Sequence, residues 1–475
     1  MTASYLFYDI ETTGLNKAFD QVLQFAAIRT DLQLNEIERH DIKVKLRPDV
    51  IPSPQAILTN RKSPDDFSAG RCEYDSVSEI HGLLNLSGTI SLGYNTLGFD
   101  DEFLRFSFHR NLLSPYTHQY KNGCRRMDVY PMAVIYYLYK TDIVSWPEID
   151  GKPSLKLEDI GAANQLVTGQ SHEAMVDVET TIELARRLFK EKKTWRYLDG
   201  YFDKETDAYR ISELPVIFQS AAGNHQKGIL VSGEYGFQQN FQIPVISIGT
   251  SLPYPNQTLW LRLDLALLQE TTLANIPETT WVIRKRFGEP GIILPPHDRY
   301  WKLFGEERDT LFEDNVRWLQ ANPDVFQAII TYYREYRYPF IPNLDADASL
   351  YQIGFFSRGD EKLCRRFHRS SMEDKVKLVD QFKSPDAREL ASRVLFRNYP
   401  EAVSGNIIEA SKKYRQRIDP QKESDALVDY RGDNRATPVG VLAEINRLRH
   451  TGDLDNMQLQ LLNDLQNYIQ TNFSK

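Results

Sequence analysis

The sequence has few cysteines and no long apolar segment. Its three cysteines, Cys72, Cys124 and Cys364, stand far apart. An odd number of isolated cysteines excludes a disulfide scaffold and a cysteine-rich zinc site, and it indicates a reducing compartment. The longest apolar run, residues 132–139, has eight residues, whereas a membrane-spanning helix needs about 20. The first residues show no basic stretch followed by an apolar one. We therefore expect no secretory signal, no membrane partner and a cytoplasmic protein.

The sequence also lacks an excess of positive charge. Its 57 basic and 65 acidic residues give a net charge of −8, which at first counts against a nucleic-acid binder. The acidic excess is local, because residues 1–180 hold 25 acidic and 17 basic side chains, while residues 361–420 hold 14 basic and 9 acidic ones. The net charge thus averages an acidic module with neutral and basic ones, and it does not exclude a nucleic-acid substrate.

The 475 residues suffice for about two to four domains. Up to residue 200, short apolar runs alternate with helical patterns. Strands are expected at 5–10, 22–30, 42–46 and 89–94, and helices at 99–113, 127–140 and 178–193. In the last helix Val178, Ile182, Ala185 and Phe189 recur at intervals of three and four. This alternation predicts an α/β fold.

Composition changes after residue 200. Residues 214–294 contain short β-rich runs separated by Gly, Pro and Asn, a pattern typical of a small antiparallel sheet or barrel. Helical patterns follow at 309–320, 324–336 and from about 345 to the end. We therefore expect three domains, at 1–198, 199–343 and 344–475.

The first chemical motif is Asp9-Ile10-Glu11, which ends the first expected strand. Residues two apart on a strand face the same side, so both carboxylates reach one point. Two carboxylates ~4 Å apart repel by about 4 kcal/mol at an effective dielectric near 20. The motif is compatible with a cation site, or with an ordinary exposed strand end.

A second motif runs from Asn95 through Phe99 to Asp100 and Asp101, at the start of an expected helix. Taken alone, its acids are as well explained by a favourable contact with the helix N-terminus. Asp128, near another helix start, is expected to be a structural cap. The third motif places His172 and Asp177 at the start of the last helix of the first part.

Together these motifs resemble the DEDDh exonuclease superfamily. Asp9 and Glu11, then Asp100 after Phe99, then His172 and Asp177 follow in that order, about 90 and 75 residues apart. Stretches along the whole chain are similar to the bacterial exonuclease I family: QFAAIRTD at 24–31, GYN at 93–95, FDDE at 99–102, WPE at 146–148, GFFS at 354–357 and LFRNYP at 395–400.

The resemblance implies a fold and an activity. It implies a ribonuclease-H-like exonuclease domain with a mixed sheet, a small SH3-like β-barrel domain and an all-helical C-terminal domain. It implies a 3′→5′ exodeoxyribonuclease that releases mononucleotides from single-stranded DNA, depends on magnesium and is recruited by single-stranded DNA-binding protein. A monomer in the bacterial cytosol is expected. The alternatives are an exoribonuclease of the same superfamily acting on RNA 3′ ends, and a catalytically silent DNA-binding scaffold.

The chemistry of the carboxylates agrees with this resemblance. Asp9, Glu11, Asp100 and Asp177 offer the oxygen ligands that Mg²⁺ or Mn²⁺ prefers. Two such ions ~3.5–4 Å apart activate a water and stabilise the leaving 3′ oxygen. We expect Asp9 to bridge both ions, and Asp100 to act mainly through water. His172 would accept the proton of the attacking water, since its ordinary pKa is near ~6.5. Asp101 is not excluded by spacing alone.

Single-stranded DNA needs polar groups for its phosphates and apolar faces for its bases. The candidate contacts are Glu11, Thr12, Thr13, Leu15, Asn95, Phe99, Phe103 and Arg105, although core packing explains the two phenylalanines equally well. By resemblance, a partner peptide with an acidic sequence and an apolar end would meet Lys140, Tyr197 and Lys227.

Overall fold

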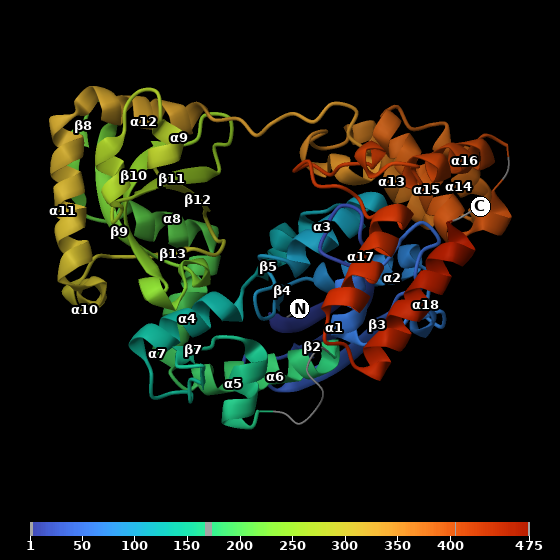
Figure 1. Ribbon diagram of the computed structural model, residues 1–475, viewed down its shortest axis with the longest axis horizontal. Coiled ribbons are helices and arrows are strands. Elements are labelled where there is room, and N and C mark those ends of the chain that lie inside the picture. The colour runs from blue at the N-terminus through green and yellow to red at the C-terminus, as the bar shows by residue number, and fades with distance from the viewer. Residues whose placement is uncertain (1–2, 167–172, 404, 474–475) are drawn as a thin grey trace.

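The computed structural model describes residues 3–166, 173–403 and 405–473. Its first part is built on a five-stranded mixed sheet with the order β3-β2-β1-β4-β5 (Figure 1). β1 pairs antiparallel with β2 and parallel with β4. The strands are β1 (Ser4–Thr12), β2 (Val22–Thr30), β3 (Glu36–Lys43), β4 (Thr89–Leu92) and β5 (Arg125–Arg126). β1 therefore lies at the centre of the sheet and runs on past the end of β4.

Helices cover both faces of this sheet, because the side chains of β1 alternate between two apolar clusters. Tyr5 and Phe7 pack with residues of α4 and α6, whereas Leu6, Tyr8 and Ile10 pack with residues of α2 and α3. The helices of this part are α1 (Pro54–Asn60), α2 (Glu73–Leu84), α3 (Asp100–Arg110), α4 (Val129–Tyr139), α5 (Leu157–Asn164), α6 (Ala174–Phe189), α7 (Lys192–Asp199) and α8 (Lys204–Ser212). A two-stranded hairpin, β6 (Glu148–Ile149) and β7 (Lys152–Pro153), precedes α5.

The second part is an antiparallel sheet of six strands with the order β12-β11-β10-β9-β13, and β8 also pairs with β9. The strands are β8 (Val216–Ser220), β9 (Gly223–Val231), β10 (Gln242–Thr250), β11 (Gln257–Arg262), β12 (Val282–Arg286) and β13 (Ile292–Leu294). The helices are α9 (Ile276–Thr279), α10 (Asp298–Trp301), α11 (Gly305–Ala321) and α12 (Pro323–Glu335). Apolar side chains of α11 and α12 form one cluster with those of β10 and β11.

The third part is helical and packs on the first. Its helices are α13 (Arg358–Arg369), α14 (Met372–Val379), α15 (Pro385–Asn398), α16 (Asn406–Ile418), α17 (Pro438–Thr451) and α18 (Asn456–Asn472). Residues of α17 and α18 share an apolar cluster with Ile57 of α1, and residues of α15 share one with Tyr74 of α2. Figure 1 shows the segment between α12 and this part crossing from the second part to the third.

Most elements agree with the sequence predictions. Val178, Ile182 and Ala185 form the buried stripe of α6 as expected. The strand predicted at 42–46 is instead β3 (Glu36–Lys43), which lacked an apolar signal because most of its side chains face solvent. Helices α1 and α2 were not predicted. Among the described residues, no helix is both long and apolar enough to cross a membrane. The domain boundaries at 198/199 and 343/344 stay predictions.

Candidate active site

Two carboxylates stand near the end of the central strand. Asp9 and Glu11 are two residues apart on β1, so both side chains point to one face of the sheet, the face that α6 covers. Asp177 lies in the first turn of α6. One carboxylate oxygen from each of these three residues lies within 4.8 Å of the other two. Three oxygen donors at this separation form a candidate site for a divalent cation.

A fourth carboxylate reaches the same place from the β4 side of β1. Asp100 is the first residue of α3, and β4 ends at Leu92, so the neighbouring edge of β1 is open at this point. The backbone N–H of Ile10 lies close enough to the Asp100 carboxylate to act against the rise of its pKa. Asp100 lies close enough to Asp9 to raise the pKa of that group. The structure thus brings together all four acidic residues predicted from the sequence.

These four carboxylates repel one another. Burial raises the pKa of Asp9 well above its ordinary value, and Asp100, Glu11 and Asp177 raise it further. Burial likewise raises the pKa of Asp100 well above its usual range. Burial and then Asp177 raise the pKa of Glu11 to about 7, while the Lys62 ammonium acts in the opposite direction. A set of oxygen donors whose charges disfavour one another suits a hard cation such as Mg²⁺ or Mn²⁺.

Asp101, which the sequence left as an alternative to Asp100, has a different role. It is fully buried and accepts hydrogen bonds from Arg105, from Arg126 at 2.6 Å and from His118 at 2.8 Å. Although burial opposes ionisation, Arg105 and Arg126 hold the pKa of Asp101 well below its usual value. The prediction that Arg105 meets a DNA phosphate is therefore wrong, because its guanidinium is buried in this cluster.

Asp128 fixes the turn that leads into α3. As predicted, it caps a helix: its carboxylate accepts a hydrogen bond from the N–H of Tyr130 at the start of α4. It also accepts hydrogen bonds from the N–H groups of Asn95 at 2.8 Å and Leu97 at 3.0 Å. Asn95 has a positive φ of 64°, which asparagine tolerates better than most residues. Its side chain is exposed, so Asn95 stays a candidate for a substrate contact.

The end of β1 and the loop that follows it carry three predicted substrate residues. The Thr12 hydroxyl donates to the carbonyl oxygen of Gly14 at 2.8 Å. Thr13 is fully buried, and its hydroxyl donates to Asp20 Oδ1 at 3.1 Å. The Thr13 side chain therefore supports the loop from inside rather than facing a nucleotide, and the predicted contact through the Thr13 backbone stays a prediction. Leu15 is 81% exposed, as a side chain that contacts a base must be.

The two phenylalanines of this region differ in the same way. Phe103 is fully buried in the cluster beneath α3, so the prediction that it contacts bases is wrong. Phe99 is half-buried, its ring centre lies 5.0 Å from that of Phe103, and the Lys17 ammonium lies 5.8 Å from the centre of the Phe99 ring. Phe99 stays a candidate for base stacking.

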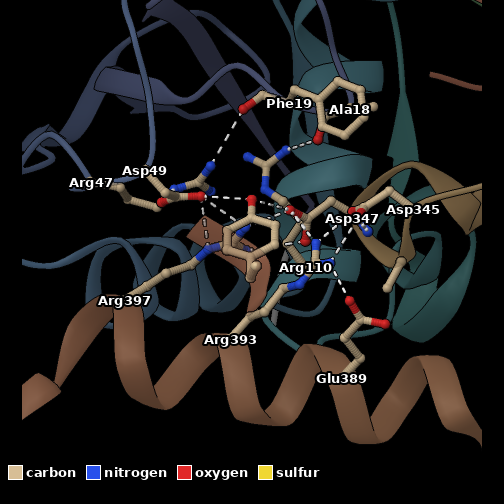
Figure 2. A network of polar contacts seen from close by, with 12 residues as sticks. Ala18, Phe19, Arg47, Asp49, Arg110, Asp345, Asp347, Glu389, Arg393 and Arg397 are labelled. Carbon is tan, nitrogen blue, oxygen red and sulfur yellow. Dashed lines mark hydrogen bonds and ion pairs between the residues drawn. The ribbon is translucent and has the colours of Figure 1, made fainter. Parts of the chain in front are cut away.

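Buried arginines donate hydrogen bonds to the backbone of the loop that follows β1 (Figure 2). Arg110 donates to the carbonyl oxygen of Ala18 at 2.8 Å, and Arg47 donates to that of Phe19 at 3.3 Å. Both arginines also pair with Glu73 of α2, at 3.1 and 2.9 Å. The loop that follows the Asp9-Glu11 motif is thus attached to the core by charged side chains.

The same network continues into the helical third part. Arg397 of α15 lies 2.9 Å from Asp49 Oδ2 and 2.5 Å from Asp347 Oδ2, and Arg393 reaches Asp345 and Asp347 (Figure 2). All five side chains are buried. The C-terminal helices therefore support the active-site loop through Asp49, which is also paired with Arg47.

No motif of the sequence points to Lys62, which the structure places beside Glu11. Its ammonium donates to Oε1 of Gln24 at 3.0 Å, and Gln24 lies opposite Glu11 on β2. Only the pairing of the strands and the packing of α1 bring this lysine to the site. His172, the predicted base, lies outside the described residues.

Comparison with known proteins identifies the family. The family model described as Exonuclease matches residues 6–185, and the model described as Exonuclease I C-terminal domain matches residues 344–472. The chain belongs to the exonuclease I family. This confirms the resemblance and the enzyme class that the sequence predicted.

Similar proteins include other members of the exonuclease I family. The chain is 28% identical over 418 residues to exodeoxyribonuclease I of Escherichia coli strain K12, covering 84% of this chain and 86% of that protein. It is 29% identical over 378 residues to exodeoxyribonuclease I of Haemophilus influenzae, covering 75% of this chain and 78% of that protein.

Solved structures confirm the predicted fold class. A structure of E. coli exonuclease I in complex with a 5cy-dT13 oligonucleotide matches 99% of this chain and 100% of its own, with a TM-score of 0.84 and 24% sequence identity. The mixed sheet, the β-rich second part and the helical third part thus belong to the exonuclease I fold.

The residues predicted to bind a partner protein lie directly after α4, in α7 and in β9. They are Lys140, Tyr197 and Lys227. The Lys227 ammonium lies 3.7 Å from the centre of the Trp301 ring. Burial raises the pKa of Tyr300, and the nearby Tyr197 raises it further. The ring centre of Tyr300 lies 4.6 Å from that of Tyr139. Lys140 directly follows Tyr139, and its ammonium lies 3.7 Å from Glu191 Oε2.

Proposed function

We propose that this protein is a 3′→5′ exodeoxyribonuclease that degrades single-stranded DNA to 5′-mononucleotides. The observation that carries the proposal is the convergence of four carboxylates at the end of β1 in a chain of the exonuclease I family. Relatives named exodeoxyribonuclease I and the oligonucleotide in the solved E. coli structure support single-stranded DNA as the substrate.

The proposed cofactor is Mg²⁺, two ions per site, with Mn²⁺ able to substitute. The donor set supports a divalent cation, because all four described side chains are carboxylates that disfavour one another's charge. One of the solved structures is a zinc-bound form of the E. coli complex with single-stranded DNA. When bound, the divalent cations activate a water and stabilise the charge on the leaving 3′ oxygen.

Each acidic side chain has an assigned part. Asp9 is the central group, since all three other carboxylates act on its pKa, and it would contribute to holding both cations. Glu11 and Asp177 would hold the cation next to the attacking water, and Asp100 would act mainly through water. His172 accepts the proton of that water as it attacks the terminal phosphodiester in line, and the bond from phosphorus to the 3′ oxygen of the preceding nucleotide breaks.

The exposed residues around the carboxylates hold the DNA 3′ end. Leu15 and the half-buried Phe99 present apolar surface to the bases. Thr12 and Glu11 lie at the end of β1, where the terminal sugar would sit, and Asn95 lies on the exposed turn before α3. Removing Leu15 should weaken DNA binding more than it slows turnover, because its side chain is apolar and exposed and cannot hold a cation or a proton.

A degradation assay tests the proposal. Oligonucleotide labelled at its 5′ end should shorten stepwise from its 3′ end in the presence of Mg²⁺ and remain intact in EDTA. Asp9→Asn and His172→Ala should each reduce turnover by at least about a hundredfold while the variants still bind the DNA. Asp142→Asn, at an exposed site, is the matched control and should keep full activity.

The assay also decides between the alternatives. A matched RNA oligonucleotide degraded much faster than DNA would replace the DNA assignment with an exoribonuclease. Binding of DNA without metal-stimulated release of nucleotides would support the silent scaffold. Wild-type turnover in Asp9→Asn would reject the role of the carboxylates.

The aromatic group around Tyr300 and Trp301 is the proposed site for single-stranded DNA-binding protein. One solved relative is described as a complex of that protein, exonuclease I and an inhibitor. A labelled peptide with acidic residues and an apolar C-terminal end should bind the wild type, and Lys227→Met should weaken binding several-fold. Lys152→Met, at an exposed lysine of the hairpin, is the control. Equal affinity in both variants would reject this site.

A further inference from the structure

Lys62 stands at the edge of the carboxylate site because of how α1 ends. Asn60, the last residue of α1, donates from its side-chain amide to the carbonyl oxygen of Thr12 at 3.3 Å. Arg61 then takes a left-handed conformation with a φ of 51°, which turns the chain away from the helix axis. The segment is thereby tied to the end of β1, and the next side chain, Lys62, points toward β2.

The Lys62 ammonium is held in a defined place. It donates to Oε1 of Gln24 at 3.0 Å, and the Gln24 amide group donates to Asp41 Oδ1 at 2.8 Å, which orients the glutamine. Gln24 is registered opposite Glu11, so the ammonium lies beside the Glu11 carboxylate on the side away from Asp100. An ammonium has three N–H donors, and the bond to Gln24 uses one of them.

A fixed positive charge beside a cation site calls for an explanation. A protein ammonium at this place repels a divalent cation and so weakens the metal site. That disadvantage is offset if the site must also hold an anion, because lysine is a strong point-charge ligand for phosphate. The side chain is only partly buried, so the two remaining N–H donors have access to a ligand in the site.

We propose that Lys62 binds a non-bridging phosphate oxygen of the nucleotide held at the carboxylate site. The assignment rests on the proposed function, since it takes a nucleotide as the ligand. It makes Lys62 a phosphate-binding residue on the Glu11 side of the site, distinct from the four carboxylates. The phosphate belongs either to a 5′-monophosphate, as in the scissile group and the product, or to a 3′-phosphorylated end.

Binding of three small probes tests this role. Thymidine 5′-monophosphate, thymidine 3′-monophosphate and thymidine are titrated calorimetrically into the full-length protein with Mg²⁺. Lys62→Met should weaken the binding of at least one monophosphate about tenfold, the usual scale for the loss of a charge-assisted hydrogen bond. The affinity for thymidine should stay unchanged. The monophosphate that loses affinity identifies the source of the phosphate. Lys62→Arg should restore most of the affinity, because it restores the charge.

The controls separate this role from a structural one. Arg61→Met changes the neighbouring, exposed cation and should alter none of the three affinities. Equal binding of both monophosphates by wild type and Lys62→Met would overturn the proposal. So would an equal loss for thymidine, because the lysine would then act through the shape of the site. Wild-type binding of the monophosphates without degradation of DNA would instead reject the proposed function alone.

Discussion

Asp9 is predicted to destabilise the fold that carries it when no metal is bound. Its side chain is half-buried, and its carboxylate lies close to those of Glu11, Asp177 and Asp100. Two full charges ~5 Å apart, close to the 4.8 Å limit between ligand oxygens of Asp9, Glu11 and Asp177, repel by about 3 kcal/mol at an effective dielectric near 20. Asp9→Asn keeps the shape of the side chain and removes this repulsion. We expect it to raise the free energy of unfolding of the metal-free protein by about 3 kcal/mol at pH 8.

The raised pKa of Glu11 determines how the free energy of unfolding changes with pH. The pKa of Glu11 is raised from 4.5 in the unfolded chain to about 7 in the folded one, so the folded state holds a proton that the unfolded state releases. Stability therefore falls as pH rises from 4.5 to 7, by roughly 3 kcal/mol for this group. At pH 5 Glu11 is mostly protonated, and the stabilisation by Asp9→Asn should shrink accordingly.

Asp101→Asn is the matched control, with the same chemical change in a neighbouring carboxylate. Asp101 pairs with Arg105, Arg126 and His118, so removing its charge leaves buried cations without their partner and should destabilise by about 3–5 kcal/mol at both pH values. The free energies of unfolding of the wild type, Asp9→Asn and Asp101→Asn are measured by urea unfolding in EDTA at pH 5 and pH 8. Mg²⁺ should then stabilise the wild type more than Asp9→Asn.

Two results would refute this reasoning. One is a loss of stability in Asp9→Asn at pH 8 in EDTA, which would mean that Asp9 has a compensating partner. The other is an equal gain at pH 5 and pH 8, which would show that the effect does not come from charge.

Three further predictions follow from the same contacts. Mn²⁺ titrations between pH 6 and 8 should show that the affinity for Mn²⁺ rises with pH, since Glu11 loses its proton near 7. Glu11→Gln should weaken Mn²⁺ binding and make its affinity depend less on pH. The same pH dependence in Glu11→Gln and the wild type would contradict this role of Glu11. Arg397→Met should lower the free energy of unfolding by about 3–5 kcal/mol, because Asp347 loses a buried partner; urea unfolding at low and high salt should show a similar loss at both. Gly93→Ala should destabilise by about 2 kcal/mol or more, since the new methyl would lie 2.4 Å from the carbonyl oxygen of Tyr8; a thermal midpoint equal to that of the wild type would reject it.

The linear order of residues predicted which carboxylates the structure brings together at the end of β1. Asp9 and Glu11 share a strand, and a period of two places both side chains on one face whatever the rest of the fold does. Asp177 was found through its position five residues after His172, a spacing that resembles the third motif of the DEDDh exonuclease superfamily. Patterns of this kind are local, so the sequence contains them without reference to distant segments.

The roles of the substrate residues were decided by packing. Thr13, Phe103 and Arg105 have the right chemistry for a nucleotide contact, yet the fold buries all three. Asp100 and Asp101 are adjacent acids, and their roles are separated by Arg126 of β5 and by His118 of the segment between α3 and β5, which join Arg105 in pairing with Asp101. Burial depends on which distant segments meet, and residue type alone does not contain that information.

The sequence by itself determined the family, the three-part α/β organisation and the four carboxylates, because each depends on residue type, spacing or periodicity. The tertiary structure alone decided that the charge of Asp101 is compensated by buried cationic partners. It also decided that Arg47 and Arg397 link the active-site loop to the C-terminal helices, and that Lys62 lies beside Glu11. Each of these facts is a contact between segments far apart in the chain, and such contacts are fixed only when the whole chain packs.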